Sequence, residues 1–260
     1  MELGTNIDVH GVTMHVRRTG TGRKVVFLHG AGGIRSWGPA FRSLAERYEL
    51  VVPDHPGFGL SGDAARVRTV GDVAMCYLDL FDQLVGTSGG IHLVGHSIGG
   101  WIAAELAVRN CSHIRSLSLI APAGVAASGV ETGDVFIWND EELLANSYHD
   151  PACIESARAS AATADADIAI RNKVAFARLA WSPRLHNPGL KHWLHRISVP
   201  TQLIWGTEDK ILPPALADEW QRGLGFERID LIPDCGHMPL VERPGETVEL
   251  LSSFIDGVQA

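Results

Sequence analysis

The sequence predicts an α/β protein whose central sheet is mostly parallel and is covered by helices on both faces. Short apolar runs without charges, such as Val25–Leu28 and Leu117–Ile120, are typical of strands that are buried on both faces. These runs alternate with stretches of helical periodicity, and two of them lead into glycine-rich turns. The chain has 260 residues, of which 45% are hydrophobic, so it is long enough for one large domain or a domain with an insertion.

The first predicted elements are strands. Val12–Arg17 alternates apolar and polar residues, as a strand at an exposed edge does, and Gly20 and Gly22 mark the turn after it. Val25–Leu28 and Leu50–Val52 are continuous apolar runs, which predict strands in the interior of the sheet.

Helices and strands alternate through most of the remaining sequence. The predicted helices are Val70–Leu84, Ile98–Val108 and Pro244–Ile255, and the predicted strands are Ile91–Val94, Leu117–Ile120, Thr201–Trp205 and Arg228–Ile232. Proline opens the last helix, where its missing N–H would have no helical partner anyway.

The alternation stops between Gly124 and Trp193, a stretch that is rich in alanine and helix-forming residues. We expect it to be a helical cap that lies over the sheet, so that residues 124–193 form the cap and residues 1–123 and 194–260 form the core. One helical face of the insertion carries Ile170, Val174, Ala177 and Trp181.

The composition argues against several classes of partner. The formal net charge is −8 and lysine and arginine form no cluster, which speaks against nucleic acid and against an anionic membrane surface. No apolar run reaches the roughly 18 residues of a membrane span, and the first residues lack the pattern of a signal peptide. The four cysteines are far apart and lack zinc-site spacing, so we expect free thiols in a cytoplasmic protein. The partner that we expect is a small-molecule substrate. The oligomeric state is left open.

The stretch GHSIGG, residues 95–100, is the first feature that points to chemistry. Ser97 directly follows the predicted strand Ile91–Val94 and directly precedes the predicted helix Ile98–Val108, with glycines close on both sides. So sharp a strand-to-helix turn needs small neighbours and exposes the hydroxyl above the carboxyl edge of the sheet, as a nucleophile elbow does. The alternative is a tight connection whose serine only caps the helix.

A serine hydroxyl is a poor nucleophile unless a base accepts its proton, and the base needs an acceptor that fixes its tautomer. His237, in the stretch LIPDCGHMP after the last predicted strand, is the best-placed base. Asp209 follows the predicted strand Thr201–Trp205 and is favoured as the acceptor because it stands between the serine and the histidine in the chain. Glu208 and Asp234 are the alternatives.

The reaction also develops an oxyanion, which needs N–H donors that are placed in advance. The main-chain N–H of Ile98, directly after the serine, is one candidate. Ala31, in the stretch HGAGG, is the second, with Gly32 as the alternative donor. Ligands of open α/β sheets bind at the carboxyl ends of strands, so the joint occurrence of these features at four predicted strand ends favours a catalytic site.

The sequence resembles the α/β-hydrolase fold family in five stretches that follow the family's order: HGAGG, DHPGFGLS, GHSIGG, WGTEDKILP and CGHMPLVERP. The resemblance covers nearly the whole chain and is weakest across residues 124–193, where the family carries a variable cap. It implies Ser97 as nucleophile, Asp209 as acid, His237 as base, and Ala31 and Ile98 as oxyanion donors.

The resemblance also narrows the reaction. Haloalkane dehalogenases and epoxide hydrolases of this fold carry an aspartate where this chain has Ser97, which argues against both classes. Lipases usually have larger apolar lids or secretion signals, and the sequence shows neither pattern. Carboxylesterases, lactonases, cofactor-free haloperoxidase-like enzymes and carbon–carbon bond hydrolases of meta-cleavage pathways remain. The last group often binds a substrate carboxylate with a cap arginine, a role for Arg171 or Arg178 unless neighbouring acids pair with them.

We therefore expect a serine hydrolase that cleaves a small ester-like substrate through an acyl-enzyme intermediate, with no metal or organic cofactor. The alternatives are a carbon–carbon bond hydrolase of a meta-cleavage-type dienoate and a hydrolase-fold protein that binds a ligand without catalysis. The candidate substrate-binding residues are Gly32, His29, Trp37, Trp138, Arg171, Phe176 and Arg178. Further aromatic candidates for the pocket wall are Phe58, Trp101, Phe136 and Trp181.

Overall fold

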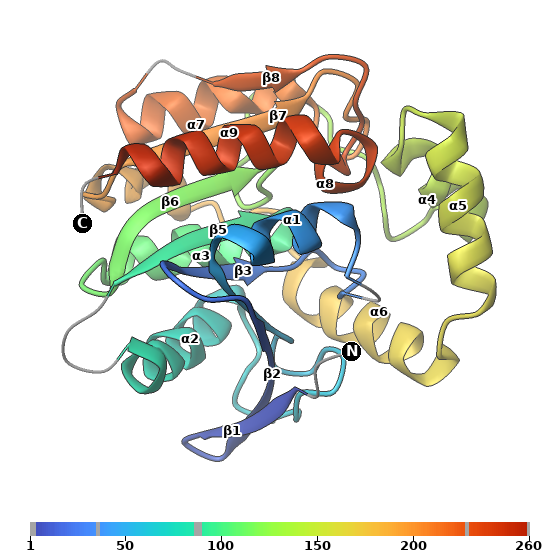
Figure 1. Ribbon diagram of the computed structural model, residues 1–260. Coiled ribbons are helices and arrows are strands. Elements are labelled where there is room, and N and C mark those ends of the chain that lie inside the picture. The colour runs from blue at the N-terminus through green and yellow to red at the C-terminus, as the bar shows by residue number, and fades with distance from the viewer. Residues whose placement is uncertain (1–3, 35–36, 86–89, 227–228, 259–260) are drawn as a thin grey trace.

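The computed structural model describes residues 4–34, 37–85, 90–226 and 229–258. In this part of the chain an eight-stranded sheet runs through the middle of the molecule (Figure 1). The strands are β1 (Thr5–Val9), β2 (Val12–Thr19), β3 (Lys24–Leu28), β4 (Glu49–Pro53), β5 (Ile91–His96), β6 (Ile114–Ile120), β7 (Thr201–Gly206) and β8 (Asp230–Ile232).

The strand order is β1-β2-β4-β3-β5-β6-β7-β8. β2 is antiparallel to both of its neighbours, and every pair from β4 to β8 is parallel. The parallel part of the sheet therefore brings the carboxyl ends of β3 to β8 to one edge, as the sequence predicts.

The helices are α1 (Pro39–Arg47), α2 (Val70–Val85), α3 (Ile98–Arg109), α4 (Asp140–Ser147), α5 (Pro151–Ala162), α6 (Ala166–Ala180), α7 (Ala217–Leu224), α8 (Pro239–Glu242) and α9 (Pro244–Gly257). Short 3₁₀ turns occur at η1 (Leu190–His192), η2 (Leu194–Arg196) and η3 (Pro214–Leu216).

The N-terminal edge differs from the prediction. Val12–Arg17 does form a strand, but it lies inside the sheet because β1 covers its outer side. β1 is polar and mostly exposed, so it lacks the apolar run by which the other strands are recognised. The short helix α1 was not predicted either, and Arg228, the first residue of the last predicted strand, lies outside the described residues.

Two apolar cores lie on opposite faces of the sheet. α2, α3 and α7 pack on one face through residues such as Leu80, Ile102 and Trp220. α1 and α9 pack on the other face, in front of the sheet in Figure 1, where the ring of Phe41 meets Phe27 edge-on at 4.9 Å between centroids. The sheet is thereby covered on both faces, which is why its parallel strands read as continuous apolar runs.

The segment between β6 and β7 carries α4, α5 and α6 and contains no named strand within the described residues. In Figure 1 these helices stand to one side of the sheet, at the end toward which β6 points. α6 packs on the core through Ala175 and Leu179, whereas its opposite face, with Ile170, Val174 and Trp181, is exposed. The apolar face that the sequence displays is thus the outer face of this helix.

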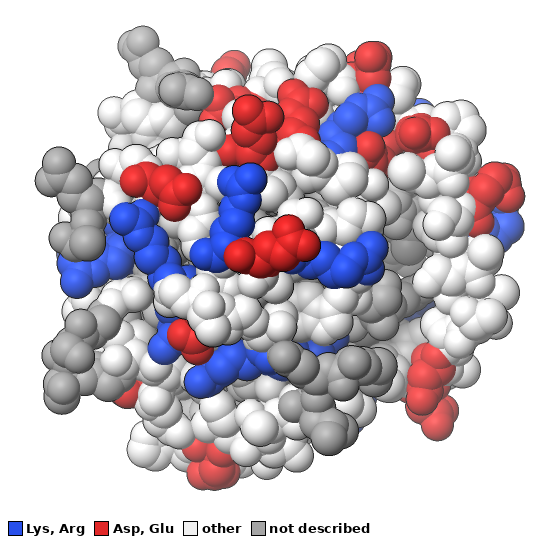
Figure 2. All heavy atoms as spheres, in the orientation of Figure 1, with Lys and Arg blue, Asp and Glu red and all other residues white. Residues whose placement is uncertain are grey.

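The charges of the described surface are mixed. Acidic and basic side chains lie interspersed on the face shown in Figure 2. No helix among the described residues has both the length and the apolarity that a membrane crossing requires. The four cysteines have free thiols, two of them buried.

Leu80 and Met75 provide a test of this packing on a single helix, because Leu80 is fully buried in α2 and Met75 is 49% exposed. We expect Leu80→Ala to lower the free energy of unfolding by about 2–5 kcal/mol, since it leaves a cavity. Met75→Ala should change it by less than about 0.5 kcal/mol. Urea unfolding of both variants measures the difference, and equal losses would contradict the described packing.

Candidate active site

Ser97 occupies the sharp turn between β5 and α3. Its backbone has φ +57° and ψ −121°, a conformation that is costly for a residue with a side chain. The Ser97 N–H donates to the carbonyl of Ile120 at 3.0 Å, and the Ser97 carbonyl accepts from the N–H of Ala123 at 3.1 Å. The end of β6 and the loop after it therefore hold both main-chain polar groups of the serine.

The glycines of the turn are required by close backbone contacts. A Cβ on Gly99 would lie 2.1 Å from the carbonyl oxygen of Leu28, and a Cβ on Gly95 would lie 2.5 Å from that of Gly99. No side chain fits at these distances. Gly99 therefore lets the elbow pack against the end of β3, and Gly95 lets the end of β5 approach the start of α3.

His237 and Asp209 form a buried pair beside this elbow. The Nδ1 atom of His237 is 2.7 Å from Oδ2 of Asp209, and both side chains are at most 5% exposed. The other carboxylate oxygen of Asp209 accepts from the N–H groups of Ile211 and Leu212, each at 2.9 Å. A carboxylate accepts hydrogen bonds and donates none, so Nδ1 of His237 carries the proton of this hydrogen bond. In the uncharged imidazole, Nε2 then has no proton and is available as a base.

The two alternative acids are placed elsewhere. The side chain of Glu208 is exposed and accepts from the hydroxyl of Thr207, and Asp234 is exposed as well. Of the three acidic candidates, the structure brings Asp209 to the imidazole.

His96 links the elbow to the loop that carries His237. Its Nε2 atom donates to the carbonyl of His237 at 2.8 Å, and the two rings are 5.0 Å apart between centroids. Burial, together with the neighbouring His237 ring, lowers the pKa of His96 to about 3. His96 is therefore a neutral donor. Because it directly precedes Ser97, its hydrogen bond holds the His237 backbone next to the elbow. Within the described residues the Ser97 hydroxyl itself makes no hydrogen bond.

Glu242 also holds the His237 loop. One oxygen of its buried carboxylate accepts from the N–H of Gly236 at 2.8 Å, and the other accepts from those of His149 and Asp150 at 2.6 and 2.9 Å. The His237 N–H donates to the carbonyl of Ser147 at 2.9 Å. The segment after α4 is thereby joined to the loop of the candidate base.

The two candidate oxyanion donors lie at the ends of β3 and β5. Ala31 is in a turn that the Gly33 N–H closes by donating to the Gly30 carbonyl at 3.1 Å. In the described part of the chain, neither the Ala31 nor the Ile98 N–H donates a hydrogen bond. Both groups are thus unpaired at the edge where Ser97 stands.

His29 has a different environment from the one expected of a substrate-binding residue. It is fully buried; its Nδ1 donates to the Gly30 carbonyl at 2.7 Å, and its Nε2 accepts from the His55 N–H at 3.3 Å. Burial lowers the pKa of His29 and of His55, whose ring lies 3.8 Å from that of His29 between centroids. Both ring nitrogens of His29 are thus engaged by main-chain groups, one of them in the turn.

The two arginines of α6 also bind the core. Arg171 donates to the carbonyls of Gly57 and Ser61 at 3.3 and 2.5 Å. Arg178 forms an ion pair with Asp63 at 2.8 Å, which lowers the pKa of that carboxyl group. Both arginines thus have oxygen partners on the protein, which is the alternative that the sequence left open.

The aromatic candidates divide between the core and the inserted segment. Trp37 packs on Phe41 at 5.6 Å between centroids, in the core below α1. Phe176 stacks on Phe136 at 5.0 Å, and both are partly buried in the segment between β6 and β7, as is Trp138.

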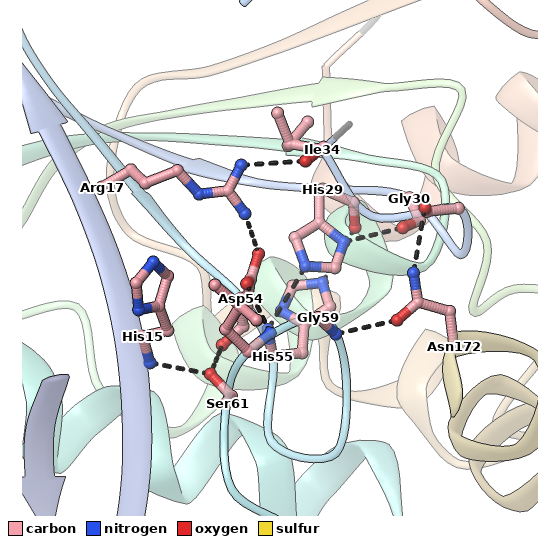
Figure 3. A network of polar contacts seen from close by, with 12 residues as sticks. His15, Arg17, His29, Gly30, Ile34, Asp54, His55, Gly59, Ser61 and Asn172 are labelled. Atoms are coloured by element: carbon pink, nitrogen blue, oxygen red, sulfur yellow. Dashed lines mark hydrogen bonds and ion pairs between the residues drawn. The ribbon is translucent and has the colours of Figure 1, made fainter. Parts of the chain in front are cut away.

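A polar network lies under the turn at residues 30–33 (Figure 3). Arg17 pairs with Asp54 and donates to the carbonyl of Ile34 at 2.8 Å. Asn172 of α6 closes the network from the other side, with its amide bonded to both Gly32 and Gly59. The sequence did not point to Asn172 or Glu242, because a single polar residue in a helix or loop does not reveal which backbone groups it will meet.

The described residues contain no cluster of histidine, cysteine, aspartate and glutamate that could hold a metal ion. What the site offers is a serine at a strained elbow, an imidazole–carboxylate pair and two unpaired amides, a set that suits nucleophilic attack on a carbonyl.

Comparison with known proteins places this chain in a family. The model of the alpha/beta hydrolase family matches residues 25–250, and the chain belongs to that family. It is 25% identical to Lipase 3 of Moraxella sp. (strain TA144), over 92% of this chain and 79% of the lipase. It is 28% identical to the pimeloyl-[acyl-carrier protein] methyl ester esterase of Nitrosomonas europaea, over 93% of this chain and 99% of the esterase.

A solved structure confirms the fold. The meta-cleavage product hydrolase from Pseudomonas fluorescens IP01 matches 99% of both chains with a TM-score of 0.81 at 21% identity. At this identity the likeness concerns the fold alone. The family and the curated relatives together support hydrolase activity for this chain.

The low pKa of His96 predicts a specific pH dependence of stability. The unfolded imidazole takes up a proton below its ordinary pKa of 6.5, whereas the folded one does so only near about 3, so stability is lost as the pH falls through this window. In the His96→Gln variant, the side chain at position 96 does not titrate in this pH range. Between pH ~7 and pH ~5 the wild type should therefore lose about 2 kcal/mol more unfolding free energy than the variant.

Chemical denaturation of both proteins at the two pH values measures this difference. Parallel losses would show that His96 does not remain neutral in the folded protein.

Proposed function

We propose that the chain is a serine hydrolase that cleaves small, uncharged ester-like substrates through an acyl-enzyme intermediate. The observation that carries the proposal is the buried hydrogen bond of 2.7 Å between His237 and Asp209, which leaves Nε2 of the imidazole as the base beside the elbow of Ser97. A carboxylate that fixes the tautomer in this way also stabilises the imidazolium that forms when the base takes a proton.

The reaction proceeds in two halves. His237 Nε2 accepts the proton of Ser97 Oγ as the oxygen attacks the carbonyl carbon, and the N–H groups of Ala31 and Ile98 bind the oxyanion. The tetrahedral intermediate expels the alcohol, which takes the proton from the imidazolium. Water then attacks the acyl-enzyme with His237 again as base, which releases the acid and restores the serine.

The charges of residues 124–193, which we propose as the cap, favour an uncharged substrate. Every lysine and arginine of this fully described segment already has an oxygen partner on the protein: Arg158, Arg171, Lys173, Arg178, Arg184 and Lys191. Binding a substrate carboxylate here would require breaking one of these contacts and desolvating the charge. This argues against a carbon–carbon bond hydrolase that takes an acidic dienoate.

The curated relatives support the choice of ester hydrolysis, since one is named a lipase and the other a methyl ester esterase. We propose Trp138 and Phe176 of the inserted segment as apolar walls for the acyl or alcohol group, because both side chains are only partly covered by the core.

Ser97→Ala is expected to lower kcat for p-nitrophenyl esters about 10³-fold or more, because it removes the nucleophile. Asp209→Asn should lower kcat by about 10³–10⁴-fold, since the imidazole loses its tautomer and its counter-charge. Hydrolysis of p-nitrophenyl acetate and butyrate, followed by absorbance, measures both.

Ser253→Ala is the matched control, because Ser253 is an exposed serine of α9. It should retain wild-type rates. Ester turnover that persists in Ser97→Ala would contradict the proposal. Cleavage of a ring-fission dienoate by a protein inert toward esters would favour carbon–carbon hydrolysis, and tight ligand binding without any turnover would favour a binding protein.

A pair of substrates of similar size tests the charge preference. p-Nitrophenyl butyrate should have a kcat/KM at least about tenfold above that of mono-p-nitrophenyl succinate, since the succinate carboxylate finds no unpaired lysine or arginine in residues 124–193 and must be desolvated. Equal or reversed values, measured at several salt concentrations, would show that a cation of the site is available to the substrate.

A further inference from the structure

The turn at residues 30–33 carries the proposed oxyanion donor Ala31 and its alternative Gly32. A single main-chain hydrogen bond of 3.1 Å, from Gly33 to Gly30, closes the turn, and Gly33 has φ +70°. A glycine-rich turn of this kind has many accessible backbone conformations, so side chains from outside must select the one that it adopts.

The core provides two of these restraints. His29 donates to the carbonyl of Gly30 at 2.7 Å, at the start of the turn. Arg17 donates to the carbonyl of Ile34 at 2.8 Å, just beyond its end. Figure 3 shows both side chains approaching the turn from the sheet. Neither of them contacts the peptide group between Gly32 and Gly33.

Asn172 provides the restraint at that peptide group, and it comes from α6. Its Nδ2 donates to the Gly32 carbonyl at 3.0 Å, and its Oδ1 accepts from the Gly59 N–H at 2.8 Å. The backbone partners fix the orientation of the amide, because a carbonyl only accepts and an N–H only donates. The residue is 5% exposed, and a Cβ on Gly33 would lie 2.8 Å from Nδ2, so the contact is close and dry.

The two arginines of α6 form their hydrogen bonds and ion pair outside the turn. Arg171 and Arg178 bind Gly57, Ser61 and Asp63, all in the loop after β4. Of these three side chains of α6, Asn172 is the one whose amide forms hydrogen bonds both to the loop after β4, at Gly59, and to the turn, at Gly32.

We infer that Asn172 is a positioning residue for the oxyanion turn, through which the seating of α6 on the core determines the geometry of the Ala31 and Gly32 amides. The inference rests on the proposed function and extends it to the inserted segment. Without the Nδ2 donor, the Gly32 carbonyl loses its hydrogen bond, and the bond from the Gly33 N–H to Gly30 is left to restrain that peptide group. The turn can then relax, which carries the adjoining amides away from the oxyanion. Because the oxyanion exists only in the tetrahedral state, the loss should affect kcat and leave KM nearly unchanged.

Asn172→Asp separates the two hydrogen bonds of the amide. The carboxylate keeps an acceptor for the Gly59 N–H and loses the donor to Gly32. We expect kcat for p-nitrophenyl acetate to fall about tenfold with KM within about twofold of wild type, less than the loss of a direct oxyanion donor. Affinity for phenylboronic acid, which forms a tetrahedral adduct with the serine oxygen, should also fall about tenfold. Asn172→Ala, which removes both bonds without adding a charge, should show at least the same losses.

Asp63→Asn is the matched control, because it weakens the ion pair of Arg178 and leaves the turn untouched. It should retain kcat and boronate affinity. Folding of each variant is verified by its thermal midpoint and circular dichroism. Wild-type kcat and boronate affinity in folded Asn172 variants would overturn the inference while Ser97-dependent turnover still supports the proposed function. Equal losses in Asp63→Asn would also overturn it, since general loosening of α6 would then explain them. Absence of turnover in the wild type would overturn both.

Discussion

The site depends on the close approach of the β5–α3 elbow to the end of β3. Ser97 keeps a left-handed backbone, and Gly99 packs so tightly on Leu28 that no Cβ fits between them. Strain of this kind persists only where the surroundings over-determine it. Here the hydrogen bonds to Ile120 and Ala123 provide that constraint. The same approach sets the elbow next to the turn at residues 30–33, where a Cβ on Gly30 would lie 3.5 Å from Cβ of Ser97.

Around this elbow, groups from distant parts of the chain are held mainly by hydrogen bonds between side chains and main-chain groups. His96 and Glu242 hold the loop of His237, and His29 and Asn172 hold the turn at residues 30–33. The inserted segment takes part in both, because residues after α4 bind the His237 loop while α6 binds the turn. The insertion therefore contacts both the loop of the candidate base and the turn of the candidate oxyanion donors.

Much of this arrangement could be predicted from the sequence, because parallel buried strands leave apolar runs and the elbow leaves glycines at fixed positions. The pairing of His237 with Asp209 followed from chain order and was found in the structure. The polar edge strand β1 had no such pattern. The partners of Arg171, Arg178 and Asn172 could not be predicted either, since they depend on how α6 sits on the loop after β4. The periodicity of a helix shows which residues share a face, but not which part of the protein that face contacts.

Chemical labelling tests the central claim, an activated serine at the elbow, most directly. An alkyl fluorophosphonate reacts with a serine only where a base and oxyanion donors activate the hydroxyl. The account predicts one phosphonate adduct, found by peptide mass spectrometry on the peptide that contains Ser97, and abolished by prior unfolding. A protein that stays unlabelled, or that carries the adduct on another serine, would contradict it.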